Sequence, residues 1–94
     1  MNEELMQKYR ITLAENLPML RTKLKMTQED LAKILNISRH TIIGIENPNR
    51  DMTWTTYLAL IYIFQKNSET AKLIEILSIA PREFDEMMEQ MSII

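Results

Sequence analysis

The chain has 94 residues, of which 46% are apolar and 26% charged, with a net charge of −2 and no cysteine. This size predicts one globular domain, residues 1–94, whose small core dimerisation would help to stabilise. The lack of cysteine excludes disulfides, and a single histidine cannot build a zinc site. No metal or other cofactor is therefore expected. No segment approaches the roughly 18 uninterrupted apolar residues of a membrane span, and the charged start MNEELMQKYR lacks the apolar run of a signal peptide, so a cytoplasmic protein without a membrane partner is expected.

Apolar residues recur at three- and four-residue spacing through the whole chain, which predicts an all-α fold. Because one glycine and three prolines leave few helix breakers, we expect a bundle of about five to seven short helices. The first helix is expected from Glu3 to about Ala14. A second helix, capped by Asn16 and with Pro18 in its first turn, is expected to end near Lys25.

Two short helices follow in close succession. Thr27 is a natural N-cap for a helix at 27–35, with acidic residues in its first turn. Asn36 tolerates the left-handed conformation that closes a helix, and Ser38 is again a strong N-cap, so another helix is expected at 38–46. Three apolar residues of the first of these helices are expected to face inward: Leu31, Ile34 and Leu35.

Three further helices are expected in the rest of the chain. The turn-forming stretch ENPNRDMT precedes Thr53, which caps the apolar and therefore central helix WTTYLALIYIF. A helix at 69–77 follows, and Pro81 opens a last helix at 82–91. Four residues at helical spacing in this last helix form an apolar stripe and a candidate dimer interface, with a peptide groove or a satellite core as alternatives: Phe84, Met87, Met88 and Met91.

The two closely linked helices have the pattern of a helix-turn-helix, in which a turn of a few residues joins two helices at a steep angle. Ala32 falls where the two helices cross and only a small side chain fits. Ile37 is the expected buried anchor of the turn, and Ile42 and Ile45 are expected to hold the second helix down. Any one of these matches is common by chance, whereas their joint occurrence across 28–47 indicates the motif.

The sequence LRTKLKMTQEDLAKILNISRHTIIGIEN, with the following loop and apolar helix, resembles the lambda-repressor-like (Cro-type) helix-turn-helix family. The resemblance covers residues 17–64 and implies a lambda-repressor-like bundle with its DNA-binding core there. Segments 1–15 and 65–94 would flank this core and make a dimer. In the family, an arginine of the first helix pairs with a glutamate at the end of the recognition helix, and Arg21 and Glu46 stand at those places.

The resemblance and the helix geometry together imply a set of DNA contacts. The family's glutamine at the start of the first motif helix, matched by Gln28, bonds a phosphate and braces the recognition helix. The outward face of the second helix enters the major groove, and its first residues contact base edges. The residues assigned to bases are Arg39, His40, Ile43 and Gly44. The residues assigned to the DNA backbone are Thr27, Gln28, Ser38, Thr41, Asn47, Asn49 and Arg50.

The base contacts differ in what they offer to DNA. Arg39 is suited to a bidentate bond with guanine, and Ile43 to contact with thymine methyl groups. With Gly44, one position of the outward face has no side chain to contact a base, and the helix can lie close to the groove wall. Specificity then depends more on the other base-contacting residues and on DNA shape. The alternatives are that Gly44 relieves a packing clash and that His40 is an ordinary surface residue.

The loop after the recognition helix is expected to differ from that of the family. Pro48 stands where the family usually has glycine, and Met52 stands where it usually has proline. A different conformation of loop 47–53 is therefore expected.

The leading expectation is a sequence-specific transcriptional regulator, most often a repressor, that binds double-stranded DNA as a homodimer. Residues 17–56 carry six basic and four acidic side chains, whereas residues 65–94 carry three and six, so the positive excess lies around the motif. The alternatives are a protein-interaction module, such as the antitoxin of a toxin-antitoxin pair, and an adaptor that does not bind DNA. An enzyme is not expected, because the sequence shows no nucleophile with a base, no metal-ligand cluster and no phosphate-cradling glycine loop.

Overall fold

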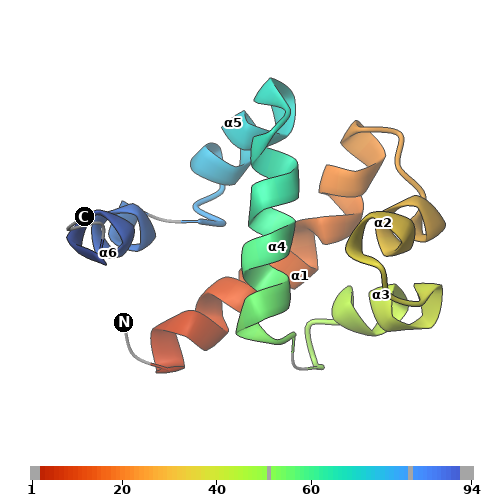
Figure 1. The fold of residues 1–94 in the computed structure, drawn as a ribbon, viewed down its shortest axis with the longest axis horizontal. Helices are drawn as coiled ribbons and strands as arrows, with labels where there is room; N and C mark the ends of the chain where they lie inside the picture. The colour runs from red at the N-terminus through yellow and green to blue at the C-terminus, as the bar shows by residue number, and fades with distance from the viewer. Residues whose placement is uncertain (1–2, 51, 81, 92–94) are drawn as a thin grey trace.

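A computed structural model describes residues 3–50, 52–80 and 82–91; the described side chains of the last helix are Glu83, Asp85, Glu86, Glu89 and Gln90. These residues form six helices and no strand, so the expected all-α fold is confirmed over the described chain (Figure 1). None of these helices has the length and apolar character needed to cross a membrane. The helices are α1 (Glu3–Lys23), α2 (Gln28–Leu35), α3 (Arg39–Ile45), α4 (Trp54–Gln65), α5 (Ser68–Ile76) and α6 (Arg82–Met91).

The first helix is continuous, and the expectation of two helices with a break near Asn16 is wrong. Asn16 is not an N-cap, because it lies within α1 and its Nδ2 donates to the carbonyl oxygen of Thr12 at 2.8 Å. Pro18 lies inside the helix and costs about 3 kcal/mol there. Burial of a leucine is worth about 2 kcal/mol, so the leucines on both sides of the proline outweigh its cost. These fully buried leucines are Leu13, Leu17 and Leu20.

Local capping signals position α2 and α3. The Thr27 hydroxyl accepts from the backbone N–H of Asp30, and the Asp30 carboxylate accepts from the N–H of Thr27, which makes a capping box. The Thr27 N–H also lowers the pKa of Asp30 below its ordinary value. Asn36 ends α2 in the left-handed conformation, and Ser38 caps α3 by accepting from the N–H of Thr41. The tight connection predicted from these residues is therefore present.

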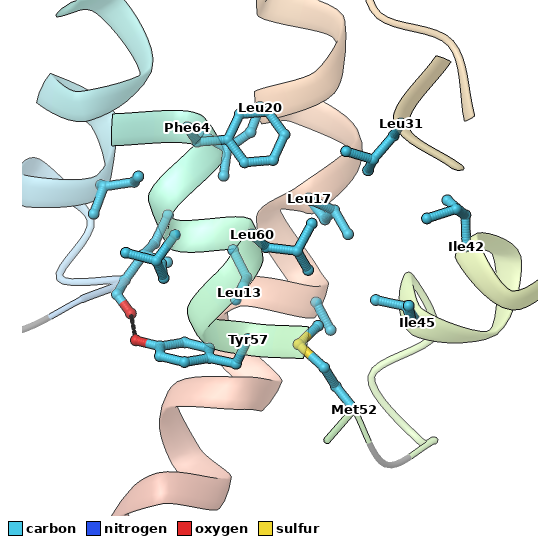
Figure 2. Packing of buried hydrophobic residues seen from close by; sticks show 14 of the residues in the cluster. Leu13, Leu17, Leu20, Leu31, Ile42, Ile45, Met52, Tyr57, Leu60 and Phe64 are labelled. Atoms are coloured by element: carbon cyan, nitrogen blue, oxygen red, sulfur yellow. Dashed lines mark hydrogen bonds between the residues drawn. The ribbon is translucent and has the colours of Figure 1, made fainter. Parts of the chain in front are cut away.

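The core lies between α1, α4 and the pair formed by α2 and α3. Figure 2 shows side chains of all these elements converging, with Leu17 of α1 and Leu60 of α4 near the middle. Thr53 caps α4 as predicted, accepting from the N–H of Thr56. The apolar helix is central because it packs against both α1 and α5, and the residues of α4 that are buried are Tyr57, Leu60, Ile61 and Phe64.

The buried positions of α2 and α3 agree with the prediction at Leu31, Ala32, Ile42 and Ile45 and differ at two isoleucines. Ile34 is 55% exposed and Ile37 is 36% exposed, so neither is the buried residue expected. Residues 31, 32 and 35 share one sector of α2, and residue 34 lies about 110° from its centre. The turn is held by its backbone instead, because the N–H of Ile37 donates to the carbonyl oxygen of Ala32 at 3.0 Å.

Tyr57 ties the centre of the bundle to the segment after α5. Its hydroxyl donates to the carbonyl oxygen of Ile79 at 2.9 Å in the buried interior (Figure 2). We expect Tyr57→Phe to lower the free energy of unfolding by about 1–2 kcal/mol, because the carbonyl loses its partner, and Tyr62→Phe, whose ring is 64% exposed, to change it little. Urea denaturation of both variants measures this. Equal stabilities of the two variants would show that the buried bond contributes nothing.

The same tyrosine also makes stability depend on alkaline pH. Burial, with a smaller contribution from Tyr9, raises the pKa of Tyr57 above its ordinary value of 10.0. Since the unfolded chain ionises first, stability falls as the pH rises above 10, and Tyr57→Phe removes this part of the fall.

The last helix lies apart from the helices described so far. Figure 1 shows α6 at the end of the molecule opposite α2 and α3. Its contact with α1 includes a hydrogen bond from the Tyr9 hydroxyl to Glu83 Oε2 at 3.4 Å. The predicted stripe of Phe84, Met87, Met88 and Met91 belongs to this helix, but these side chains lie outside the described residues.

Candidate nucleic-acid interface

The helix α3 is buried along one edge and open along the other. Ile42 and Ile45 point into the core (Figure 2), while Arg39, His40 and Ile43 are exposed. The Ser38 and Thr41 hydroxyls lie 2.8 Å apart at its exposed N-terminal end. The structure thus places the first base-contact candidates on one accessible surface, with Ser38 and Thr41 at its start.

A network of three side chains holds the C-terminal end of α3. Arg21 Nε donates to Glu46 Oε2 at 2.7 Å and Nη2 donates to Oε1 at 3.2 Å, which is a bidentate ion pair. Gln28 Nε2 donates to the same Oε1 at 2.9 Å, and Arg21 Nη1 donates to the carbonyl oxygen of Met26 at 3.1 Å. The side chains of Arg21 and Glu46 are only 15% and 8% exposed. The network therefore joins α1, the start of α2 and the end of α3 inside a largely water-excluded site.

A depression of about 480 Å³ lies at the N-terminal end of α2. Its lining residues are Arg21, Thr27, Gln28, Glu29 and Arg39. The positive end of the helix dipole and Arg39 favour an anion here, whereas the carboxylate of Glu29 opposes it and the charge of Arg21 is already compensated by Glu46. The capping box occupies the N–H groups of Thr27 and Asp30, so the backbone donors left for an anion in this first turn are those of Gln28 and Glu29.

The chain turns back sharply after α3. Asn47 Oδ1 accepts from the N–H of Asn49 at 3.0 Å, and the carbonyl oxygen of Asn47 accepts from the N–H of Arg50 at 3.0 Å. Pro48 occupies the second position of this four-residue turn, which its ring geometry favours. The side chain of Arg50 consequently lies over Gly44 of α3.

Residues 19–48 match a protein-family model described as helix-turn-helix. Over these residues the chain is similar to helix-turn-helix domains of the lambda-repressor-like kind. Domains of this kind bind DNA, with the second helix in the major groove. Comparison with curated proteins gives no significant match, and comparison with solved structures gives none either.

The helix-turn-helix brings predicted contact residues together in two places. Thr27, Gln28 and Arg39 surround the depression, and Gly44 and Arg50 touch at the far end of α3. The helix α6 does not join them, because it lies at the opposite end of the molecule (Figure 1).

Two features of the helix-turn-helix were missed by sequence reasoning. Glu29 lines the depression, which its position directly after Gln28 at a helix start could have indicated. Arg50 packs on Gly44, and no sequence signal predicts this contact because it depends on the shape of the turn between them.

Proposed function

We propose that the protein is a sequence-specific transcriptional regulator, acting as a repressor, that binds DNA as a homodimer. The observation that carries the proposal is the exposed edge of α3, where Arg39, His40 and Ile43 are free to enter a groove while Ile42 and Ile45 hold the opposite edge in the core. The Arg21–Glu46 ion pair braces the C-terminal end of this helix against α1.

The surfaces around α3 suit a DNA duplex in two ways. The depression lined by Arg21, Gln28 and Arg39 binds one backbone phosphate. With that phosphate in place, the N-terminal end of α3 faces the base edges, where Arg39 is positioned to contact guanine. We expect the binding to weaken steeply with salt, because each phosphate contact releases counterions.

The proposal of a dimer follows from the small size of this surface and from the position of α6. One recognition helix reads only a few base pairs, and helix-turn-helix dimers place two of them about one DNA turn apart. A second protomer that packs on α6 would leave both α3 helices open but more than one DNA turn apart, because α6 lies at the opposite end from α3 (Figure 1), so the half-sites would be separated by a multiple of the turn. A dimer bound in this way to a promoter excludes other proteins from it, which is the mechanism of repression that we propose.

The test is selection of preferred sites from random duplexes by the wild-type protein at two salt concentrations, with the mass of the complex measured. The proposal predicts a two-fold-symmetric motif bound by two protomers. Retention of DNA without sequence preference, lost at modest salt, would contradict it and favour a protein partner instead.

The carboxylate of Glu29 is expected to limit DNA affinity. Since Glu29 lines the phosphate depression, we expect Glu29→Gln to bind the selected duplex about threefold more tightly while slightly destabilising α2 through the lost dipole interaction. Fluorescence anisotropy and thermal melting measure the two effects.

Glu69 gives a matched control, because it lies in the first turn of α5, outside the depression. Glu69→Gln should destabilise its helix similarly and leave DNA affinity unchanged. Equal affinities of the two variants would show that no phosphate lies near Glu29.

A further inference from the structure

The only glycine of the chain lies under an arginine side chain rather than under open space. A Cβ built on Gly44 would be 3.6 Å from Arg50 Nη1 and 3.8 Å from Arg50 Cδ. The glycine has no positive φ, so its backbone does not require the residue type. The lack of a side chain at position 44 instead leaves a flat seat on α3, which the side chain of Arg50 occupies.

The turn after α3 is built to return Arg50 to this seat. Asn47 accepts from two backbone N–H groups, with its side chain from Asn49 and with its carbonyl from Arg50. Pro48 restricts the backbone at the second position of the turn. The turn therefore places the backbone of Arg50 so that its side chain reaches α3.

The seat lies on the part of α3 that faces outward. Gly44 is one helical turn beyond His40 and next to Ile43, which is exposed. It is five residues beyond Arg39, which corresponds to about 7.5 Å along the helix axis, or about two base-pair steps. An arginine on this seat can present its donors to a groove that also receives Arg39.

We propose that Arg50 is a specificity-determining residue that reads a base edge from its seat on Gly44, in place of the side chain that the helix lacks there. The planar guanidinium suits bidentate recognition of guanine O6 and N7. The inference rests on the proposed DNA-binding function and changes the role expected for Arg50 from backbone contact to base reader. It predicts a preferred guanine about two base pairs from the position read by Arg39.

The experiment is site selection from random duplexes with wild type, Arg50→Ala and Arg50→Lys, using Lys72→Ala on α5 as the control for loss of one positive charge. We expect Arg50→Ala to lose the preference at one base position in each half-site, with about tenfold weaker binding to the selected site and a much smaller change on random duplex. Arg50→Lys should recover the affinity for random duplex without the base preference, because lysine has no bidentate fork.

Variants of Gly44 test the seat itself. Gly44→Ala keeps an ordinary contact distance to a flexible side chain and should retain the base preference. Gly44→Leu should displace Arg50 and reproduce the loss seen in Arg50→Ala; circular dichroism verifies that the variant is folded.

The outcomes separate the inference from the function on which it rests. If wild type selects a motif and Arg50→Ala weakens binding equally on all sequences, Arg50 is a backbone contact and the inference is wrong. If wild type selects no motif, the proposed function itself fails. Loss of one base preference in Arg50→Ala, with all preferences kept in Lys72→Ala, supports the inference.

Discussion

Replacement of Arg21 by methionine is expected to lower the free energy of unfolding by about 3 kcal/mol. Methionine keeps the packing of the aliphatic stem but leaves Glu46, whose side chain is 8% exposed, as a largely buried carboxylate with only the neutral amide of Gln28 as a side-chain partner. A loss of this size lowers the melting temperature of a domain this small by more than about 10 °C. Thermal and urea denaturation measure the effect.

Arg10 provides the matched control, because it also lies on α1 and pairs with a glutamate. Its partner Glu3 is 72% exposed, so water can solvate that carboxylate when the arginine is removed. Arg10→Met should therefore cost less than about 1 kcal/mol. If Arg21→Met and Arg10→Met were equally stable, the Arg21–Glu46 pair would contribute no more than a surface pair.

Replacement of Arg39 by alanine is expected to weaken binding to the selected duplex by about tenfold to a hundredfold, because one bidentate contact to guanine is lost. The Arg39 side chain is exposed and lies outside the hydrophobic core, so the melting temperature should stay within a few degrees of wild type. Anisotropy titrations on the selected duplex and on a random duplex measure the change in specificity.

Arg39 also lines the depression at the start of α2, so a pure phosphate contact is the competing role. That role predicts equal weakening on both duplexes, whereas base reading predicts a larger loss on the selected one. His40→Ala, altered at the adjacent exposed position, should relax the preference at a different base pair. Unchanged preferences in both variants would refute the assigned roles.

The parts of the fold that the sequence predicted are those with local causes. Thr27 and Ser38 cap helices through hydrogen bonds to backbone groups three residues away, and Asn36 adopts the left-handed conformation that asparagine tolerates. The continuity of α1 could not be predicted in this way. Pro18 is a local break signal, and the packing of Leu13 and the leucines after it against α4 outweighs it only in the folded molecule.

The candidate site shows the same division. The outward face of α3 follows from helical periodicity, so the placement of Arg39 and His40 was accessible from the sequence. The contact of Arg50 with Gly44 could not be predicted in this way, because it depends on the conformation of the whole turn from Asn47 to Arg50. The position of a loop side chain that packs on a helix is determined by the conformation of the whole turn rather than by one residue.

We expect α3 to enter the major groove with its exposed edge toward the bases. Methylation interference on the selected duplex tests it most directly, because methylation of guanine N7 alters the major groove and methylation of adenine N3 alters the minor groove. We predict that N7 methylation blocks binding in two patches on one face of the duplex, one or more whole helical turns apart. Interference only at adenine N3, or none at any base, would contradict the account.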